Sequence, residues 1–233
     1  MSSDLTPDEV CDPALDQLVA ERLEVVRERI RLAGGIGVEV LPVTKTFPPA
    51  ACWAAFRAGC SAVGENYAQE VVAKFGAQRS LPFGVHFIGQ LQTNKVRLLA
   101  PLVTCYETID RESVLREVAK RVPGAAVLVQ VNTSSEPGKG GCAIDQVPEL
   151  VERAVAAGLR VRGLMTVGPT VGGPEDARPG FRAVRALCDS LSLEVCSMGM
   201  TADLDVAVQE GATEVRVGSA LFGGRPPAAR AVR

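Results

Sequence analysis

Short apolar runs alternate with longer amphipathic stretches from residue 38 almost to the end of this chain. Short apolar runs are typical of strands buried on both faces, and strands separated by helices form parallel sheets. The runs predict strands over residues 38–44, 62–64, 86–89, 103–106, 126–132, 161–167, 194–198 and 214–217. The stretches between them predict helices over residues 49–58, 67–76, 93–99, 111–121, 145–157, 175–190 and 202–210.

Eight such strands with alternating helices predict an α/β protein of the (β/α)8 TIM barrel type. A doubly wound open sheet is the alternative, because the number of strands does not distinguish a closed sheet from an open one. The length of 233 residues is near the lower end of the range for barrels. No GxGxxG motif follows the first strand, where a dinucleotide-binding open sheet would carry it. Both observations favour the barrel.

An amphipathic segment precedes the first strand and predicts an extra N-terminal helix. Apolar residues from Leu15 to Ile30 recur at steps of three and four residues, with charged residues between them, and Gly34 and Gly35 end the pattern. We expect one domain over residues 1–233, with residues 1–13 disordered and residues 225–233 forming a flexible tail. The glycine- and proline-containing stretch 168–180 is expected to be a mobile loop.

Composition excludes several classes of function. Net charge is −2 and aromatic residues make up 4% of the chain, so neither nucleic acid nor an anionic membrane is an expected partner. The seven cysteines show no CxxC spacing and the chain has one histidine, so no metal site is expected. Scattered thiols, no secretory leader and no apolar run long enough to span a membrane predict a cytoplasmic protein.

Lys45 follows the first predicted strand, within the sequence VEVLPVTKTFPP (residues 38–49). In (β/α)8 barrels the chemistry takes place at the carboxyl ends of the strands, and Lys45 lies at such an end. A partly desolvated lysine amine is a good nucleophile toward aldehydes, because burial lowers its pKa. Lys45 is therefore a candidate Schiff-base residue, and a solvated loop lysine is the alternative.

Two strand-to-helix turns near the end of the chain are candidates for binding phosphate. The first runs from Ser197 to Thr201, and the second contains Gly218 and Ser219. Glycine lets the backbone approach an anion, while hydroxyls and free N–H groups at a helix start bind phosphate. Each turn alone is also an ordinary connection. Arg216 lies in the apolar run EVRVG, where it either pairs with a carboxylate or faces the ring of a phosphorylated aldehyde cofactor.

Several motifs in a fixed order resemble one family. They are LPVTKTFP, VGENYAQE, HFIGQLQTNKVR, TIDR, VLVQVNTSSEPGKGG, VRGLMTVGP and SMGMTADLDVAVQEGATEVRVGSALFG. From about residue 36 to residue 224 the chain resembles the pyridoxal phosphate homeostasis proteins, single-domain relatives of the alanine racemase N-terminal barrel. The resemblance implies the vitamin B6 cofactor pyridoxal 5'-phosphate (PLP), held as a Schiff base on Lys45.

The resemblance also implies roles for other residues. Phosphate would be bound by Ser197, Thr201, Gly218 and Ser219. Arg216 would face the ring nitrogen, Asn66 and His86 would lie near the cofactor, and Met165 and Met200 would wall the pocket. The residue types alone fit a capping asparagine, a core histidine and core methionines equally well. Thr201 stands where the family often has serine, and either hydroxyl can donate to phosphate.

The resemblance leaves two functions to compare. A racemase needs a base on each face of the substrate α-carbon, and in alanine racemases a tyrosine from a second domain supplies one of them. This chain ends at Arg233, so we expect no such domain, and neither Tyr67 nor Tyr106 lies in a supporting motif. We expect a monomeric PLP-binding protein without a catalytic reaction, which buffers PLP or delivers it to apo-enzymes. A weak PLP-dependent amino-acid racemase is the alternative.

Overall fold

The computed structural model of the protein describes residues 12–78, 80–134, 136 and 138–224. The disorder expected for residues 1–11 and the flexibility expected for residues 225–233 concern segments outside the described residues. Helix α1 (Pro13–Leu32) begins within the stretch expected to be disordered. Its start is defined by Asp12, whose Oδ1 accepts a hydrogen bond of 3.1 Å from the Leu15 N–H.

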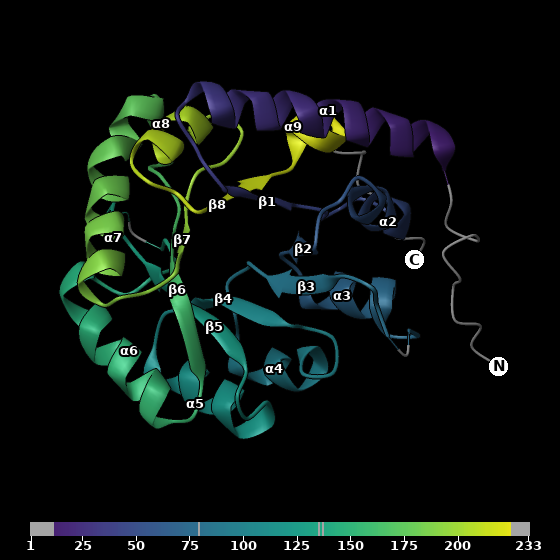
Figure 1. Ribbon diagram of the computed structural model, residues 1–233. Helices are drawn as coiled ribbons and strands as arrows, with labels where there is room; N and C mark the ends of the chain where they lie inside the picture. Colours follow the sequence, from purple (N-terminus) through teal and green to yellow (C-terminus); the bar gives the residue numbers. More distant parts are fainter. Residues whose placement is uncertain (1–11, 79, 135, 137, 225–233) are drawn as a thin grey trace.

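Within the described residues, eight parallel strands form one sheet in the order β1-β8-β7-β6-β5-β4-β3-β2. The strands are β1 (Glu39–Pro42), β2 (Ala62–Glu65), β3 (Gly84–Phe87), β4 (Cys105–Ile109), β5 (Ala126–Val131), β6 (Arg160–Thr166), β7 (Val195–Ser197) and β8 (Glu214–Val217). An isolated parallel bridge between Val43 and Gly64 joins the ends of β1 and β2. The sheet therefore curls into a nearly closed barrel (Figure 1), and the predicted (β/α)8 fold is confirmed.

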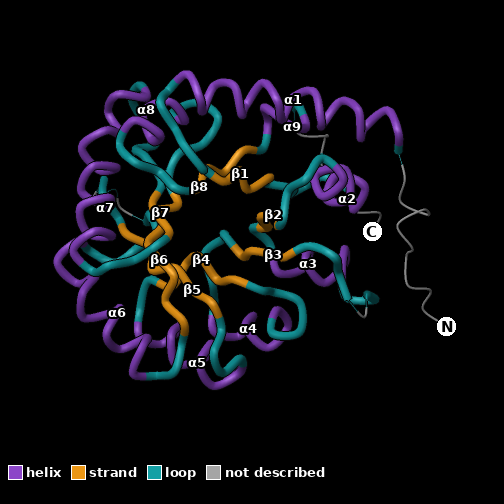
Figure 2. Tube along the Cα trace, in the orientation of Figure 1, coloured by secondary structure: helices purple, strands orange, loops and turns teal. Residues whose placement is uncertain are grey.

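Helices form a ring outside the strands (Figure 2). They are α2 (Pro49–Arg57), α3 (Ala68–Phe75), α4 (Thr93–Leu99), α5 (Glu112–Arg121), α6 (Val147–Ala156), α7 (Arg178–Ser190), α8 (Leu204–Gln209) and α9 (Ser219–Phe222). Short 3-10 turns, η1 (Ile144–Gln146) and η2 (Pro174–Ala177), precede α6 and α7. The stretch 168–180, expected to be a mobile loop, thus holds η2 and the first residues of α7.

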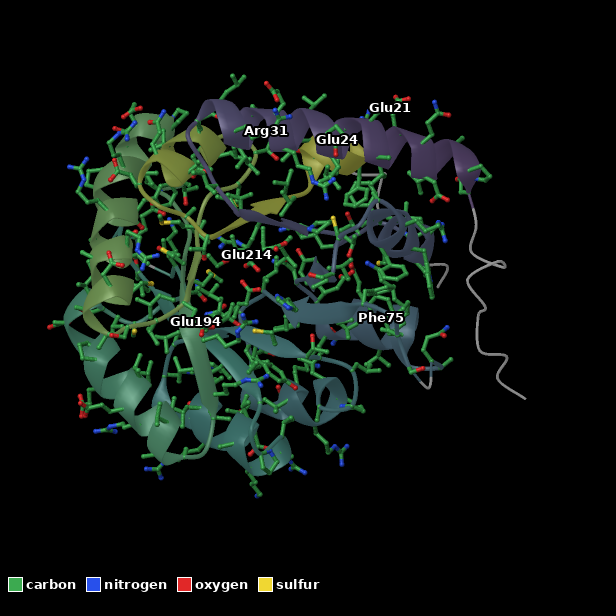
Figure 3. The ribbon with its side chains drawn as sticks, viewed as in Figure 1. Glu21, Glu24, Arg31, Phe75, Glu194 and Glu214 are labelled. Carbon is green, nitrogen blue, oxygen red and sulfur yellow. The ribbon has the colours of Figure 1, made fainter. Side chains whose placement is uncertain are left out.

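The predicted N-terminal helix α1 lies across the outside of α2, α8 and α9 (Figure 1). Its buried face consists of Val19, Leu23, Val26 and Ile30, which belong to the main hydrophobic core. Charged residues such as Glu21, Glu24 and Arg31 lie on its outer face (Figure 3). No helix in the described part of the chain is long and apolar enough to cross a membrane.

The barrel has an apolar layer outside the strands and a mixed interior. Strand β8 shows why, because its side chains alternate between the two sides of the sheet. Val215 and Val217 belong to the layer between strands and helices, while Glu214 and Arg216 lie on the interior side. The apolar cluster of the interior is small and consists of Cys105, Ala126, Leu128 and Met165. Buried polar side chains, among them Glu107, Ser197 and Arg216, occupy much of the remaining interior.

Candidate functional site

A cavity of about 260 Å³ lies at the carboxyl end of the barrel, where β1, β7 and β8 lead into their helices. Six of the residues singled out in the sequence line it together: Lys45, Met200, Thr201, Arg216, Gly218 and Ser219. Val43, Phe47, Ala202 and Gly223 complete the lining. The two predicted phosphate turns and the predicted lysine therefore share one cavity, although more than 150 residues separate them in the sequence.

Lys45 is half-buried and lies just past the point where β1 and β2 join. Val43 bridges Gly64, and the N–H of Thr44 donates to the Gly64 carbonyl over 3.0 Å. Continuing this register by two residues sets Lys45 beside Asn66, which follows β2. The buried Oδ1 atom of Asn66 has no hydrogen-bond partner among the described residues. Asn66 thus offers an unused buried acceptor next to the lysine.

A buried ion pair fixes the backbone on both sides of Lys45. Lys74 of α3 contacts Glu65 at 2.6 Å and donates to the carbonyl of Thr44 over 2.7 Å. The Thr44 hydroxyl donates to the same Glu65 carboxylate over 2.6 Å. Burial raises the pKa of the Glu65 carboxyl above its ordinary value, and the charge of Lys74 opposes this shift. The strand end that carries Lys45 is thereby tied to β2 and α3.

The residue after Lys45 has an unusual backbone conformation. Thr46 has φ of +67°, in the left-handed region that non-glycine residues rarely adopt. Its N–H donates to Glu70 Oε2 over 2.8 Å, which holds the turn in place. The sequence analysis did not single out the supporting residues Glu65, Glu70 and Lys74, because no sequence motif shows that residues of β2 and α3 contact the end of β1.

The two phosphate turns meet in the same cavity. The Thr201 and Ser219 hydroxyl oxygens lie 3.5 Å apart, so one group can contact both. Gly199 has φ of +90°, and a Cβ atom there would lie 2.4 Å from the Cβ of Ala207. The next residue, Met200, donates its N–H to Asp203 Oδ1 over 2.6 Å. Met200 remains 41% exposed at the cavity mouth.

Arg216 forms the inner wall of the cavity and is almost fully buried. Its guanidinium donates to the Ser197 hydroxyl over 2.7 Å and to the Thr166 carbonyl over 2.6 Å. Ser197 in turn donates to Glu107 Oε2 over 3.1 Å. These bonds fix the orientation of the guanidinium and offset the desolvation of a buried charge.

Four of the predicted site residues are not part of the cavity lining: Asn66, which follows β2 next to Lys45, and Ser197, His86 and Met165. Ser197 is fully buried beneath Arg216 and orients it, instead of lining the cavity. His86 lies inside the barrel, where its Nδ1 is 2.7 Å from Glu107 Oε1, and it lines a second cavity at the opposite end. Met165 is 1% exposed and belongs to the small interior core. Met165 thus lies in the core, whereas His86 is only partly buried and faces the second cavity.

Known proteins resemble this chain in both sequence and structure. The sequence matches the family of the alanine racemase N-terminal domain over residues 17–226. It is 40% identical over 222 residues to a pyridoxal phosphate homeostasis protein of Aquifex aeolicus, covering 88% of this chain and 97% of the relative. The corresponding protein of Pseudomonas aeruginosa is 37% identical over 220 residues, covering 89% of this chain and 96% of the relative.

A solved structure shows the same fold. PipY of Synechococcus elongatus, whose structure has PLP bound, superimposes with a TM-score of 0.77 at 27% identity, covering 88% of this chain and 100% of that one. The identities, the extent of the matches and the shared barrel agree with one another. The chain therefore belongs to the pyridoxal phosphate homeostasis protein family.

Proposed function

We propose that this protein binds PLP in the cavity beside Lys45 and holds it reversibly as a Schiff base on that lysine. The observation that carries the proposal is the meeting of one half-buried lysine with the two hydroxyls of Thr201 and Ser219 in a single cavity. An amine binds an aldehyde, and paired hydroxyls beside glycine bind a phosphate. The PLP-bound relative with the same barrel supports this choice of ligand.

The residues of the cavity fit PLP. A Cβ atom at Gly218 would lie 3.3 Å from the Val43 carbonyl, so glycine keeps this side of the cavity open. Thr201 and Ser219 would hold the phosphate, Met200 would cover the mouth and Arg216 would face the ring nitrogen. Asn66 Oδ1, buried without a partner among the described residues, would accept a hydrogen bond from the cofactor.

A role in storing or delivering PLP is favoured over catalysis. Among the described residues that line the cavity, Lys45 is the only side chain able to act as a base, because a guanidinium stays protonated. Tyr106 is buried in the layer between strands and helices, and Tyr67 is outside the lining. A permanently charged Arg216 at the ring nitrogen would also weaken the ring as an electron sink.

The protein would then act as a monomeric carrier that exchanges PLP with apo-enzymes. A Schiff base suits this role, since it forms and breaks reversibly with any accepting amine. The match to the alanine racemase N-terminal domain keeps weak amino-acid racemisation as the second candidate. Racemisation needs a second base, for which the described part of the cavity offers no side chain.

Borohydride reduction tests the binding proposal. The wild-type protein mixed with PLP is expected to show a visible absorption band and, after reduction, to carry the label on the peptide containing Lys45. Lys45→Ala should lose both signals, while the exposed lysine variant Lys120→Ala should keep them. A wild-type protein that stays colourless with excess PLP, or a label elsewhere, would overturn the assignment.

A second measurement separates carrier from enzyme. Alanine and serine are incubated with the loaded protein in deuterium oxide, and deuterium at Cα is followed by mass spectrometry. We expect no incorporation above that of free PLP, and transfer of PLP to an apo-enzyme in stoichiometric amount. Turnover that depends on Lys45 would instead establish the racemase.

A further inference from the structure

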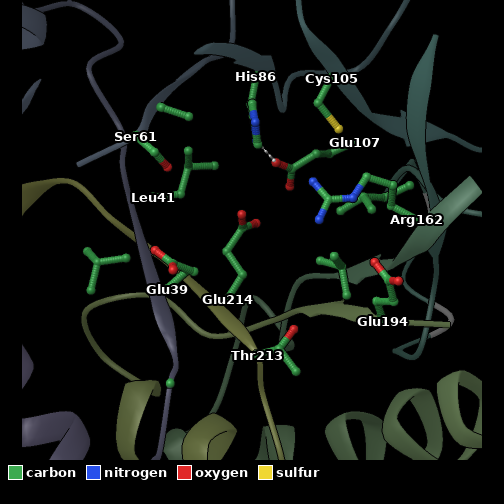
Figure 4. A pocket seen from close by; sticks show the side chains of 15 residues that line it. Glu39, Leu41, Ser61, His86, Cys105, Glu107, Arg162, Glu194, Thr213 and Glu214 are labelled. Carbon is green, nitrogen blue, oxygen red and sulfur yellow. Dashed lines mark hydrogen bonds and ion pairs between the residues drawn. The ribbon is translucent and has the colours of Figure 1, made fainter. Parts of the chain in front are cut away.

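The barrel has a second cavity, of about 360 Å³, at the amino end of the strands. The Val43–Gly64 bridge lies at the other end of the β1–β2 junction, and the residues at the start of both strands line the cavity. Ionisable side chains from several strands point into it (Figure 4). They are Glu39, His86, Cys105, Glu107, Arg162, Glu194 and Glu214.

Three of these side chains form a group of metal-ligating atoms. The ligand atoms of His86, Cys105 and Glu107 all lie within 4.8 Å of one another. The sheet brings them together, because His86 of β3 pairs in register with Cys105 of β4. Glu107 follows two residues later on β4 and therefore faces the same side. The three residues share no zinc-motif spacing, so the sequence showed no metal site.

A fourth side chain points independently to a missing ligand. Glu214 is only 9% exposed, and its carboxylate extends into the cavity toward Glu107 and His86 (Figure 4). Its Oε1 atom is buried without a hydrogen-bond partner among the described residues. Burying a carboxylate oxygen without a hydrogen bond is unfavourable in free energy, which indicates that another group binds there.

The charge of the cavity indicates a cation. Among the described residues, four carboxylates line it, the buried ones of Glu107 and Glu214 and the exposed ones of Glu39 and Glu194. The cationic or potentially cationic groups of the lining are the guanidinium of Arg162 and the imidazole of His86. Arg216 lies beyond Ser197 and already donates to Ser197 and to the Thr166 carbonyl. Buried carboxylates that face one another repel, and a divalent cation removes that repulsion.

We propose that His86, Cys105, Glu107 and Glu214 bind a Zn²⁺ ion at the amino end of the barrel. Thiolate, imidazole and carboxylate are the donors that zinc combines in tetrahedral sites. Tetrahedral bond lengths hold donors about 3.3–3.8 Å apart, so the three clustered side chains reach the ion with shifts of about 1 Å.

Binding would rearrange protons as follows. His86 Nδ1 and Glu107 Oε1, now 2.7 Å apart, would each bond to zinc in place of their hydrogen bond. The proton of that hydrogen bond is released to solvent, and the neutral imidazole carries its remaining proton on Nε2. The Cys105 thiol releases its proton to solvent as the zinc–sulfur bond forms. Glu107 Oε2 still accepts from Ser197, which orients the ligand from outside the metal's coordination sphere.

Metal titration of the full-length protein tests the site. Chelator-treated, reduced protein is titrated with Zn²⁺ against a competing chelator, and with Co²⁺, which gives a charge-transfer band when bonded to thiolate. We expect one ion per chain and a thiolate band. Cys105→Ser should abolish the band and weaken Zn²⁺ binding at least as much as the ~10–100-fold loss typical of outer-sphere changes.

Matched variants make the result decisive. Cys142→Ser changes another buried cysteine, outside the cavity lining, and should bind both metals as the wild type does. Lys45→Ala should also bind zinc normally, so failure of the PLP proposal would leave this one standing. Glu214→Gln keeps the shape of the side chain and should keep the thiolate band while weakening zinc at least about tenfold.

Two results would overturn the proposal. One is a wild-type protein that takes up no stoichiometric zinc. The other is a thiolate band that survives in Cys105→Ser. If circular dichroism shows that Cys105→Ser does not fold, the test rests on Glu214→Gln. Wild-type affinity of that variant for zinc would reject the four-ligand site.

Discussion

Gly199 is the residue where backbone shape and the candidate site are most directly linked. Its φ is +90°, and an added Cβ would lie 2.4 Å from the Cβ of Ala207, well inside van der Waals contact. Gly199→Ala should therefore destabilise the protein by more than the ~1–2 kcal/mol that left-handed backbone alone costs an alanine. Because Met200 and Thr201 follow directly, PLP binding should weaken as well. Urea unfolding and PLP titration measure the two effects.

Gly158 provides the matched control for this prediction. It has a similar φ of +80°, but nothing lies within 4 Å of the position of its Cβ. The free energy of unfolding of Gly158→Ala should fall only by the conformational cost of about 1–2 kcal/mol, and this variant should bind PLP as the wild type does. Equal losses of stability in the two variants would show that the contact with Ala207 has no energetic effect.

At the residue scale, the sequence predicted the cavity mouth better than the barrel interior. Lys45 and Thr201 lie in the turns that follow β1 and β7, and Ser219 begins α9 just after β8. Every parallel strand ends at the same side of the barrel, so their meeting follows from topology. His86 and Ser197 lie within strands. The depth that a strand residue reaches in a barrel depends on strand stagger, which no local pattern reports. Their hydrogen bonds to Glu107 and Arg216 were therefore not foreseen.

At the scale of the elements, apolar patterns located every strand but not every strand end. Strand β8 covers the predicted residues 214–217, because its two valines mark it clearly. Strand β4 continues to Ile109, three residues beyond the prediction, through Glu107 and Thr108. Both polar side chains are buried and hydrogen-bonded, to Ser197 and to the Gly89 carbonyl respectively. Buried polar residues whose hydrogen bonds are made by other segments of the barrel interrupt the apolar pattern without ending the strand.

Helices α7 and α8 are joined by an ion-pair cluster with a predictable pH dependence. Glu210, just after α8, accepts hydrogen bonds from Arg182 and Arg178 of α7, which lower its pKa below the ordinary value of 4.5. A group whose pKa is lower in the folded state stabilises the fold above its ordinary pKa, and the effect is lost as the pH falls through the folded-state pKa. Glu210→Gln should therefore lower Tm at pH 7.

The difference in Tm between the wild type and Glu210→Gln should shrink as the medium is acidified and vanish below the pKa of Glu210. Calorimetry or circular dichroism over a pH series measures it. Glu175→Gln is the control, because Glu175 is exposed and pairs with Arg178 only within its own turn. A surface pair of that kind contributes little. A Glu210→Gln effect that stays constant down to strongly acidic pH would contradict the ion-pair explanation.

At the scale of the whole molecule, the junction of β1 and β2 is where the barrel closes. The other seven pairs of neighbouring strands are joined by backbone pairing between strand residues. Among the described residues, β1 and β2 are joined by the single bridge between Val43 and Gly64. The two proposed sites lie at opposite ends of this junction. At the Lys45 end, side chains complete the closure: Thr44 on the β1 side donates to Glu65 of β2, and Lys74 donates to both residues.

Removing Lys74 should therefore weaken the closure of the barrel and not only one contact. Lys74→Met leaves the fully buried Glu65 carboxylate without its counter-charge, and breaking a buried pair in this way costs about 3–5 kcal/mol. The double variant Glu65→Gln with Lys74→Met removes the stranded charge and should recover much of the loss. Lys120→Met, on the exposed side of α5, should change little.

Urea unfolding gives the stabilities of these variants, and hydrogen exchange of the Thr44 amide reports on the junction of β1 and β2. Faster exchange is expected in Lys74→Met, because the Thr44 amide donates to the Gly64 carbonyl across the junction of β1 and β2. Unchanged exchange together with full stability would mean that backbone pairing alone closes the barrel.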